Sequence, residues 1–562
     1  MPTRRAAAVL AVAVALLLAG CAGIPVSGGV NVGVVQNADV QGASSFTPRG
    51  PAGNASPTDI VRGFIDAGTG QKSAIGKNNG YGVARSFLTP ALATQWDPNA
   101  RVLVHATNYS VTRSGSDAYT VTVPTVARVD ARGSYTTTAD PSSSGAVKPR
   151  SVALRMQLTK TAKGWRIASA PAGIVLLQVN FDKLFSPTPL TFFDPTFTRT
   201  VPDLRWYANS ADVPHAVLAG LAAGPAGPIA APVAVSAFPT GSRVTSVRVT
   251  SGVAAVDVTT PSPLPAVTVQ RIRTQVQSSL PAVSDVQVSV DGVQQASTGT
   301  PAGQTDSPDP NPLIRRGAAV GFLEGSILRR DTVLGRQVQA VGPLGATVSD
   351  RLRIAAVRTA DGVRVVTPTA HALVDARDGL IDPSLDPLGW TWSVPRDDPD
   401  GLMAFHGHDR AQHLHGPFGA AQSIDTIEVS RDGTRLLVLL ATQAGPVGRV
   451  IGIERDAKGA PIGLSSQWYA VPAPGARGLD ATWVDSGTVA ALTSTADGDQ
   501  VTQVQVGGAQ SVPLARPGDA TAIVGGAGRS ELTVLLRGGG LARYDEAWRT
   551  IGTGVSLLAV QR

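Results

Sequence analysis

Four of the seven histidines of this 562-residue chain are clustered within ten residues, as His406, His408, His413 and His415. If residues 409–412 form a four-residue hairpin loop, position 408 faces 413 and position 406 faces 415. Side chains alternate along a strand, so all four imidazoles then lie on one face of a sheet, where they could bind Zn²⁺, Ni²⁺ or Cu²⁺. The alternative is a chance accumulation on an exposed hairpin, because no carboxylate is placed to orient the rings. The segment predicts a weak metal site at most.

Other catalytic signatures are absent from the sequence. It contains no G-x-S-x-G, P-loop, H-E-x-x-H or C-x-x-C motif. The carboxylates Asp397, Asp398 and Asp400 lie in a Pro- and Gly-rich stretch that is typical of a solvated loop. Asp257 ends a predicted strand, where backbone hydrogen bonding is favoured over a ligand-facing role. We therefore expect no catalytic residue, no cofactor and no enzymatic activity.

Cys21 is the only cysteine, and it follows an apolar leader. Arg4 and Arg5 precede the run 6–19, which has the order of a secretory signal. Fourteen residues at 1.5 Å each cover about 21 Å, less than a bilayer core of about 30 Å. The ending Leu-Ala-Gly-Cys resembles the lipobox of bacterial lipoproteins. This resemblance implies that 1–20 is a signal peptide and that Cys21 carries a diacylglyceryl group. Together with palmitate, this would anchor the protein on the extracytoplasmic face of the cell membrane.

Composition narrows the fold and the partners. The chain has 48 basic and 41 acidic side chains, only 16% charged residues, and no basic cluster interleaved with aromatics. We therefore expect no binding to nucleic acid. The 61 glycines and 41 prolines favour many short strands. The length predicts several domains, since single cores stop growing near about 250–300 residues.

The pattern after the leader predicts a tether, 21–56, and a small α+β domain, 57–185. A helix is predicted from Pro57, followed by short helices at 81–88 and 90–96. Alternating runs predict strands at 102–104, 109–112, 118–128, 152–158 and 165–168. Helices on one face of a curved sheet form an NTF2-like cone. Such a cone can hold a ligand, or its interior can be filled by side chains.

The region 186–300 predicts a second α+β domain with the order β–α–β–β–α–β. Helices are predicted at 215–221 and 269–280, and strands at 244–249, 254–258 and 286–290. The region resembles the GerMN domain of spore-germination and lipoprotein families. The matching residues are Leu221, Gly224, Pro225, Pro239, Gly241, Val244, Val247, Gly252, Ala254, Val256 and Asp257.

A Pro-rich linker, 301–312, precedes a repetitive region, 313–562. Six strand-turn-strand passages start at residues 318, 352, 388, 426, 479 and 520, so their spacings are 34, 36, 38, 53 and 41. These spacings approach the 40–50 residues of propeller blades, with one insertion. The clearest passage turns at Asp432-Gly433, a pair that suits tight reversals. We predict an all-β propeller of about six blades; five blades or a sandwich would give a similar period.

The order of these segments resembles the actinobacterial LpqB lipoprotein family, including Cys-Ala-Gly-Ile-Pro from Cys21 and Val-Gly-Phe-Leu from Val320. The resemblance implies a non-enzymatic accessory of the MtrA/MtrB two-component system. Such a protein contacts the ectodomain of the sensor histidine kinase MtrB and influences envelope homeostasis and cell division.

An alternative is an envelope lipoprotein that binds or hydrolyses carbohydrate in a propeller pocket. Hydrolysis would require paired carboxylates about 5–9.5 Å apart. Four arginines near the start of the repetitive region could contact acidic partners or lipid headgroups, or could simply be solvated. They are Arg315, Arg316, Arg329 and Arg330.

Overall fold

The computed structural model describes residues 48–70, 81–142, 144, 146–209, 213–297, 311–330, 332–349, 351–407, 410–419 and 421–561. The predicted signal peptide, Cys21, most of the tether and of the linker, and His408 lie outside the described residues. In the part of the chain that is described, no helix has the length and apolar character needed to cross a membrane.

Three helices open the first region. Helix α2 (Pro57–Asp66) begins where the Ser56 side chain accepts a hydrogen bond from the Asp59 N–H and Asp59 bonds back to Ser56, a capping box. Its apolar stripe buries Ile60, Val61, Phe64 and Ile65. The two short helices are α3 (Gly82–Ser86) and α4 (Pro90–Gln95). All three agree with the helices predicted from the sequence.

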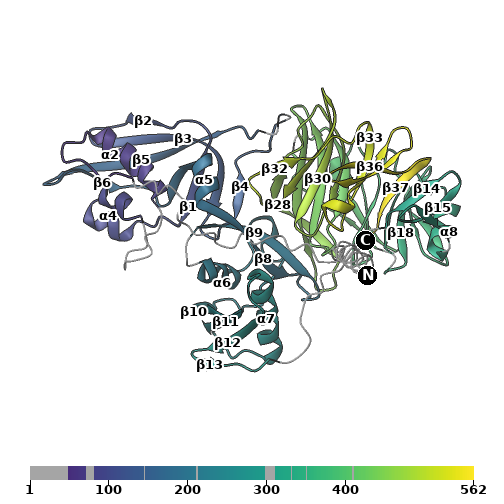
Figure 1. Cartoon of the computed structure of the whole chain (residues 1–562), viewed down its shortest axis with the longest axis horizontal. Coiled ribbons are helices and arrows are strands. Elements are labelled where there is room, and N and C mark those ends of the chain that lie inside the picture. Colours follow the sequence, from purple (N-terminus) through teal and green to yellow (C-terminus); the bar gives the residue numbers. More distant parts are fainter. Residues whose placement is uncertain are drawn as a thin grey trace, which may run out of the picture. The chain divides into compact units, whose positions relative to one another are not determined.

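These helices belong to the same region as a seven-stranded sheet (Figure 1). Five of its strands follow the order β6-β5-β3-β1-β7, and the other two, β2 and β4, each pair with β3. The strands are β1 (Arg101–His105), β2 (Ser110–Arg113), β3 (Ala118–Asp130), β4 (Tyr135–Thr137), β5 (Arg150–Thr161), β6 (Gly164–Ser169) and β7 (Ile174–Leu177). The α+β prediction is confirmed, although β4 and β7 were not predicted. The cavity between helices and sheet has only about 20 Å³ and is lined by Phe64, Trp96 and Met156 among others, so side chains fill this interior.

A short helix, α5 (Gln178–Leu184), leads into a long hairpin of β8 (Phe185–Phe193) and β9 (Thr200–Ala208). The next elements are α6 (Val213–Ala223), η2 (Gly227–Ile229), β10 (Arg243–Thr250), β11 (Val253–Thr259), α7 (Ala266–Ser279), β12 (Asp285–Val290) and β13 (Val293–Gln294). The sheet order is β10-β11-β12-β13, with β11 and β12 parallel. The predicted helices and the predicted strands at 244–249, 254–258 and 286–290 are confirmed. The strand that opens the predicted β–α–β–β–α–β order is instead part of the separate hairpin of β8 and β9.

The remaining described residues form an all-β region with one eight-stranded and four four-stranded sheets. The eight-stranded sheet contains β14 (Leu313–Arg316), β15 (Ala319–Glu324), β16 (Ile327–Arg329), β17 (Gly345–Ser349), β18 (Ile354–Thr359), β19 (Gly362–Val366), β20 (His371–Asp375) and β37 (Val555–Gln561). Helix α8 (Val333–Ala340) lies between β16 and β17 in the chain.

Each four-stranded sheet is a consecutive meander. The first two contain β21 (Ser384–Leu385), β22 (Thr391–Ser393), β23 (Met403–His406) and β24 (Arg410–His413), then β25 (Ser423–Val429), β26 (Arg435–Thr442), β27 (Gly445–Arg455) and β28 (Pro461–Val471). The last two contain β29 (Arg477–Trp483), β30 (Thr488–Thr495), β31 (Gly498–Gln505) and β32 (Ser511–Pro513), then β33 (Ala520–Val524), β34 (Thr533–Leu536), β35 (Leu541–Asp545) and β36 (Ala547–Gly552).

The all-β region closes on itself. Strand β37 pairs antiparallel with β14 and parallel with β17, so the last strand joins the two ends of the region. Strands β17, β21, β25, β29, β33 and β37 each pack against the next, and the last packs against the first. This ring is propeller-like and removes the open edges that a single sheet would expose. The long spacing of 53 residues arises largely from the eleven-residue strands β27 and β28.

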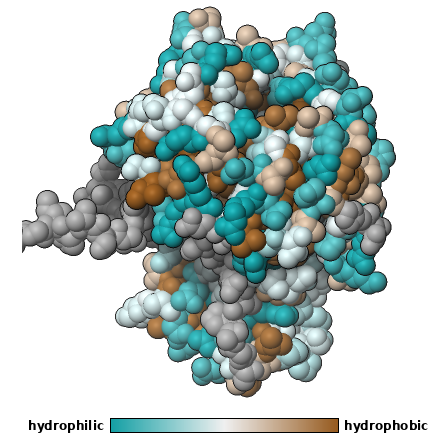
Figure 2. All heavy atoms as spheres, turned by 90° about the vertical axis from the view of Figure 1, so that its right-hand side faces the viewer, coloured by the Kyte–Doolittle hydropathy of each residue, from teal (hydrophilic) through white to brown (hydrophobic). Residues whose placement is uncertain are grey.

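The outer surface of this region is chemically mixed. Figure 2 shows hydrophobic side chains distributed between hydrophilic ones on the side that carries β14, β15 and α8. In the eight-stranded sheet, α8 and the loops between them, the exposed large apolar residues are Ile327, Val333, Leu344 and Leu373. Single exposed apolar side chains of this kind are common on protein surfaces.

Candidate functional site

The histidine-rich hairpin has a different register from the predicted one. Strand β23 pairs with β24 so that Met403 faces His413 and His406 faces Arg410. Strand β24 already begins at Arg410, inside the predicted loop at 409–412, and Gly407, which follows β23, has a φ of 62° that suits glycine. Positions 403 and 406 are three apart, so His406 and His413 project to opposite faces of the sheet. The predicted face of four imidazoles is therefore wrong.

The histidines that are described have ordinary surroundings. The His406 ring packs 5.2 Å from Trp390, centroid to centroid. His413 places Nε2 2.7 Å from the Asp400 carbonyl oxygen, and its ring lies 4.3 Å from that of His415. Among the described residues, which exclude His408, no group of three or more His, Cys, Asp or Glu side chains is arranged to hold a metal ion.

The strand-end carboxylate has a structural role, whereas the loop carboxylates are exposed. Asp257 accepts hydrogen bonds from the Thr245 hydroxyl at 2.7 Å and the Gly292 N–H at 2.8 Å. These bonds, the first above all, lower the pKa of Asp257. The carboxylates Asp397, Asp398 and Asp400 are all exposed, as expected for a solvated loop.

The inner strands of the all-β region carry carboxyl groups that join neighbouring sheets. Asp480 of β29 accepts from the Thr426 hydroxyl at 2.9 Å and from the N–H groups of Ala481 at 2.8 Å and Ile523 at 2.9 Å. Thr426 belongs to β25 and Ile523 to β33, so one carboxyl connects three consecutive inner strands. Buried Glu428 accepts from the Thr482 hydroxyl at 3.2 Å. The geometry assigns these groups to holding the ring together.

The Asp480 carboxyl makes the stability of the ring depend on pH. Desolvation raises its pKa to about 7, with a smaller contribution from the charge of Glu428. An acid whose folded pKa lies above its unfolded value stabilises the fold fully at low pH, and this stability is lost as pH rises from about 4 through 7. In the wild type, this group lowers the free energy of unfolding by at most about 1.4 kcal/mol for each pH unit in that range. Asn cannot ionise, so we expect Asp480→Asn to lack this decrease. Urea unfolding at pH 5 and pH 8 measures it, and equal slopes in both proteins would contradict the prediction.

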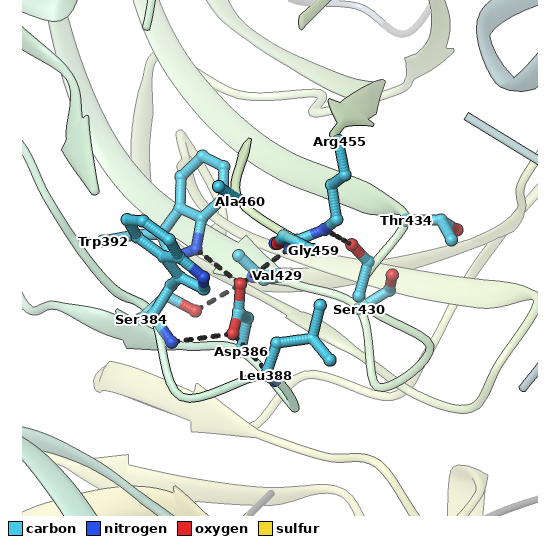
Figure 3. Close-up of polar contacts among 12 residues, drawn as sticks. Ser384, Asp386, Leu388, Trp392, Val429, Ser430, Thr434, Arg455, Gly459 and Ala460 are labelled. Atoms are coloured by element: carbon cyan, nitrogen blue, oxygen red, sulfur yellow. Dashed lines mark hydrogen bonds and ion pairs between the residues drawn. The ribbon is translucent and has the colours of Figure 1, made fainter. Parts of the chain in front are cut away.

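A second buried polar cluster surrounds Asp386, between β21 and β22 (Figure 3). Its carboxylate forms an ion pair of 2.6 Å with Arg455 and accepts from the Trp392 indole N–H at 3.2 Å. It also accepts from the N–H groups of Leu388 and Trp390, both at 2.9 Å. Arg455 comes from β27, so the cluster ties two neighbouring sheets together.

The β8–β9 hairpin is the junction between the three regions. Asp203 and Arg205 of β9 form an ion pair in which both side chains are fully buried. Arg205 also donates to the carbonyl of Arg132 in the first region at 2.9 Å. The Tyr469 hydroxyl, from β28, donates to Asp203 at 3.3 Å. Next to the pair, the Trp206 indole donates to the Gly507 carbonyl at 3.0 Å.

Two further contacts strengthen this junction. Asp140 of the first region pairs with Arg449 of β27 at 2.5 Å and accepts from the Trp468 indole at 2.7 Å, and the guanidinium lies 4.2 Å from that indole ring. Segment η2 packs so closely on β27 that a Cβ at Gly452 would lie 2.0 Å from the Pro228 carbonyl oxygen. Apolar side chains of the second α+β region and of the all-β region belong to one core cluster. The described regions are thus connected by a buried polar and apolar network.

A hollow lies beside the same hairpin. It has a volume of about 420 Å³ and is lined by the first region, the end of β9 and one face of α6. Its walls include the aromatic residues Tyr81, Trp206 and Tyr207. Sequence reasoning did not identify this site, because its walls come from segments far apart in the chain.

Three family models match consecutive parts of the chain. Residues 50–182 match the N-terminal domain of lipoprotein LpqB, and residues 333–557 match the LpqB beta-propeller domain. Between them, residues 189–296 match the Germane domain of sporulation and spore germination.

Curated relatives carry the name lipoprotein LpqB. The protein of Cutibacterium acnes is 33% identical over 260 residues, which cover 46% of this chain and 40% of the relative. That of Rhodococcus opacus is 29% identical over 224 residues, covering 39% and 34%. That of Thermobifida fusca is 33% identical over 208 residues, covering 36% and 31%. The matched segment therefore spans less than half the length of each relative.

Similar solved structures include the tandem GerMN domains of the sporulation protein GerM from Bacillus subtilis, with 17% identity, a TM-score of 0.16, and coverage of 22% of this chain and 46% of that chain. TolB from Acinetobacter baumannii has 11% identity, a TM-score of 0.30, and coverage of 45% and 66%. The family matches confirm the resemblance to LpqB lipoproteins and the GerMN-like and propeller domains that the sequence predicts.

Proposed function

We propose that this relative of the LpqB lipoproteins is a membrane-anchored, extracytoplasmic and non-enzymatic accessory of a sensor histidine kinase of the MtrB type. It influences envelope homeostasis and cell division by contacting the kinase ectodomain. The observation that carries the proposal is the series of three family matches along the chain. The buried junction around Asp203 and Arg205 adds that the three regions are connected through one hairpin. A protein that shifts a partner's conformational equilibrium must bind one state better than the other, and a rigid surface supports such discrimination.

The proposal includes finer features of the fold. We interpret the first region as an NTF2-like cone with a filled interior. We interpret the eight-stranded sheet as two blades joined through β17 and β37, so that the all-β region is a six-bladed propeller closed by its last strand. Propellers present broad, rigid surfaces and loops, which suits a binding role.

The anchor is the second part of the proposal. Residues 1–20 act as the signal peptide, and Cys21 receives a diacylglyceryl group and palmitate. Two acyl chains give stable attachment, whereas a single chain gives only reversible attachment. Attachment also confines the protein to the membrane surface, which raises its effective concentration near a membrane-embedded kinase.

Crosslinking in intact cells tests both parts. We expect pull-down through the wild-type chain to recover a sensor histidine kinase, and Cys21→Ser to reduce this recovery at least tenfold, because the unanchored protein leaves the membrane surface. Labelling with radioactive palmitate is the accompanying control, and it should mark only the wild type. Recovery of envelope glycans without any kinase, or equal recovery with Cys21→Ser, would overturn the proposal.

A hydrolytic role for the propeller finds no support in the inner carboxyl groups. Asp480 and Glu428 accept hydrogen bonds from neighbouring strands, and Asp425 forms an ion pair with Arg396. The hollow beside α6 has no lining residue from the all-β region, so it lends no support to a carbohydrate pocket in the propeller.

A further inference from the structure

We propose that the hollow between the first region, β9 and α6 is a binding site for a neutral glycan fragment of one or two sugar rings. This site lies outside the propeller, and its occupancy does not depend on the proposed contact with a kinase. Its volume of about 420 Å³ falls within the range of about 300–1,000 Å³ that small-molecule sites have. It also lies between domains, where such sites are common.

The wall formed by α6 explains why space exists there. The residues that face the hollow from this helix are His215, Ala216, Ala219, Gly220 and Ala223. Apart from the histidine, they have small side chains or none. A Cβ at Gly220 would lie 2.4 Å from the Tyr207 hydroxyl oxygen, so glycine allows the helix to approach this ring. The helix therefore lines the hollow mainly with small side chains and lies close to the Tyr207 ring.

The other lining residues combine aromatic rings with polar groups. Burial raises the pKa of both Tyr81 and Tyr207 to about 12, so both phenols stay neutral at physiological pH. Asn99 also lines the hollow, and its amide can donate and accept hydrogen bonds. The Thr69 hydroxyl donates to the Asp66 carbonyl at 2.8 Å and can still accept a hydrogen bond. A sugar ring has an apolar C–H face, which packs on aromatic rings, and hydroxyl groups at its edge, which bond to amides and hydroxyls.

The charge of the lining favours a neutral ligand. Arg132 and Asp130 are one cation and one anion, and Asp130 accepts from the N–H groups of Arg132 at 2.8 Å and Ser134 at 2.9 Å. The lining therefore offers no excess of cations for a phosphate. A fatty acyl chain would leave the polar groups of Asn99 and His215 without hydrogen bonds to the ligand, which is costly on burial.

The site is also coupled to the propeller. Trp206 lines the hollow, and its indole N–H donates to the Gly507 carbonyl of the all-β region. A ligand packed against this segment stabilises the arrangement of the regions that surround it. Binding of a glycan would thereby be transmitted to the junction around Asp203 and Arg205.

Calorimetric titration of the full-length lipoprotein tests the inference, in a zwitterionic detergent whose headgroup contains no sugar. The probe is N,N′-diacetylchitobiose, and inorganic phosphate, octanoate and trialanine are titrated in parallel. We expect saturable binding of the disaccharide with 1:1 stoichiometry and no saturable heat with the other three. Exclusive binding of phosphate, octanoate or trialanine, or no saturable heat with the disaccharide, would overturn the proposal.

Variants locate the binding. Ala219 is exposed on α6, so Ala219→Phe fills the hollow without disturbing a core and should weaken disaccharide binding at least tenfold. Asn99→Ala, also at an exposed position, should weaken it about three- to tenfold through the loss of a hydrogen bond. The matched control is Ala91→Phe, an exposed alanine of α4 outside the hollow, which should bind as the wild type does. Equal affinities in Ala219→Phe and Ala91→Phe would show that the sugar binds elsewhere.

Discussion

Replacing Asp386 with alanine is expected to lower the free energy of unfolding of the all-β region by about 3–5 kcal/mol. The Asp386 side chain is fully buried and its partner Arg455 is 6% exposed. Its removal leaves a buried guanidinium without its counter-ion, and the Trp392 indole and two backbone N–H groups without an acceptor. Leaving one member of a buried pair uncompensated costs more than the pair itself contributes. Urea unfolding followed by tryptophan fluorescence measures the change, because Trp390 and Trp392 lie beside the cluster.

The matched control is Asp519→Ala. Asp519 pairs with Arg537 at 3.0 Å, but the two side chains are 66% and 68% exposed. Surface pairs contribute at most about 1 kcal/mol, since water solvates both charges after the pair is broken. Similar losses in the two variants would mean that burial of the Asp386 cluster does not determine its contribution.

The predictable part of this fold is the part encoded by short-range patterns. Ser56 and Asp59 form a capping box three residues apart, and the stripe of Ile60 and Phe64 identifies the buried face of α2. Gly433 takes a φ of 75° in the predicted Asp-Gly turn, which glycine adopts at little cost. The three-residue strand β4 was missed because it is too short to establish an alternating period, and β7 because its pattern is a continuous apolar run.

The prediction for the histidine-rich hairpin was wrong in the register of its two strands. Whether side chains share a face depends on the length of the turn, and a shift in pairing can move residues to the other side of the sheet. The observed register pairs His413 with Met403 and His406 with Arg410, and this pairing separates His406 from His413. The identity of the residues was therefore informative, but their spacing did not determine their arrangement.

The junction and the hollow were not predicted because their partners are distant in sequence. Asp203 meets Tyr469 across 266 positions, and Trp206 meets Gly507 across 301. One local signal was present, because Asp203 and Arg205 are two apart in a strand and so project to the same face. Opposite charges on one face of an otherwise apolar strand indicate a buried pair, although they do not identify what covers it.

Disruption of that pair provides the second large effect. We expect Arg205→Met to leave the Asp203 carboxylate buried without its cation, and to lower the free energy of unfolding by about 3–5 kcal/mol. The double variant Asp203→Leu/Arg205→Met replaces both charges with apolar groups of similar volume, so most of this loss should be recovered. Thermal unfolding and limited proteolysis measure the two variants side by side.

The same variants test whether the junction connects the regions mechanically. The bond between Arg205 and the Arg132 carbonyl is lost in Arg205→Met, and Tyr469 then donates to a carboxylate that has lost its counter-ion. We expect a single cooperative transition in the wild type to separate into two in Arg205→Met, and proteolytic cleavage between the regions to become faster. Asp285→Ala is the control, because its pair with Arg273 at 2.7 Å is partly exposed at 48% and 34%. If Arg205→Met and Asp285→Ala unfold alike, the hairpin does not couple the regions, and the rigid surface on which the regulatory proposal depends would have to be abandoned.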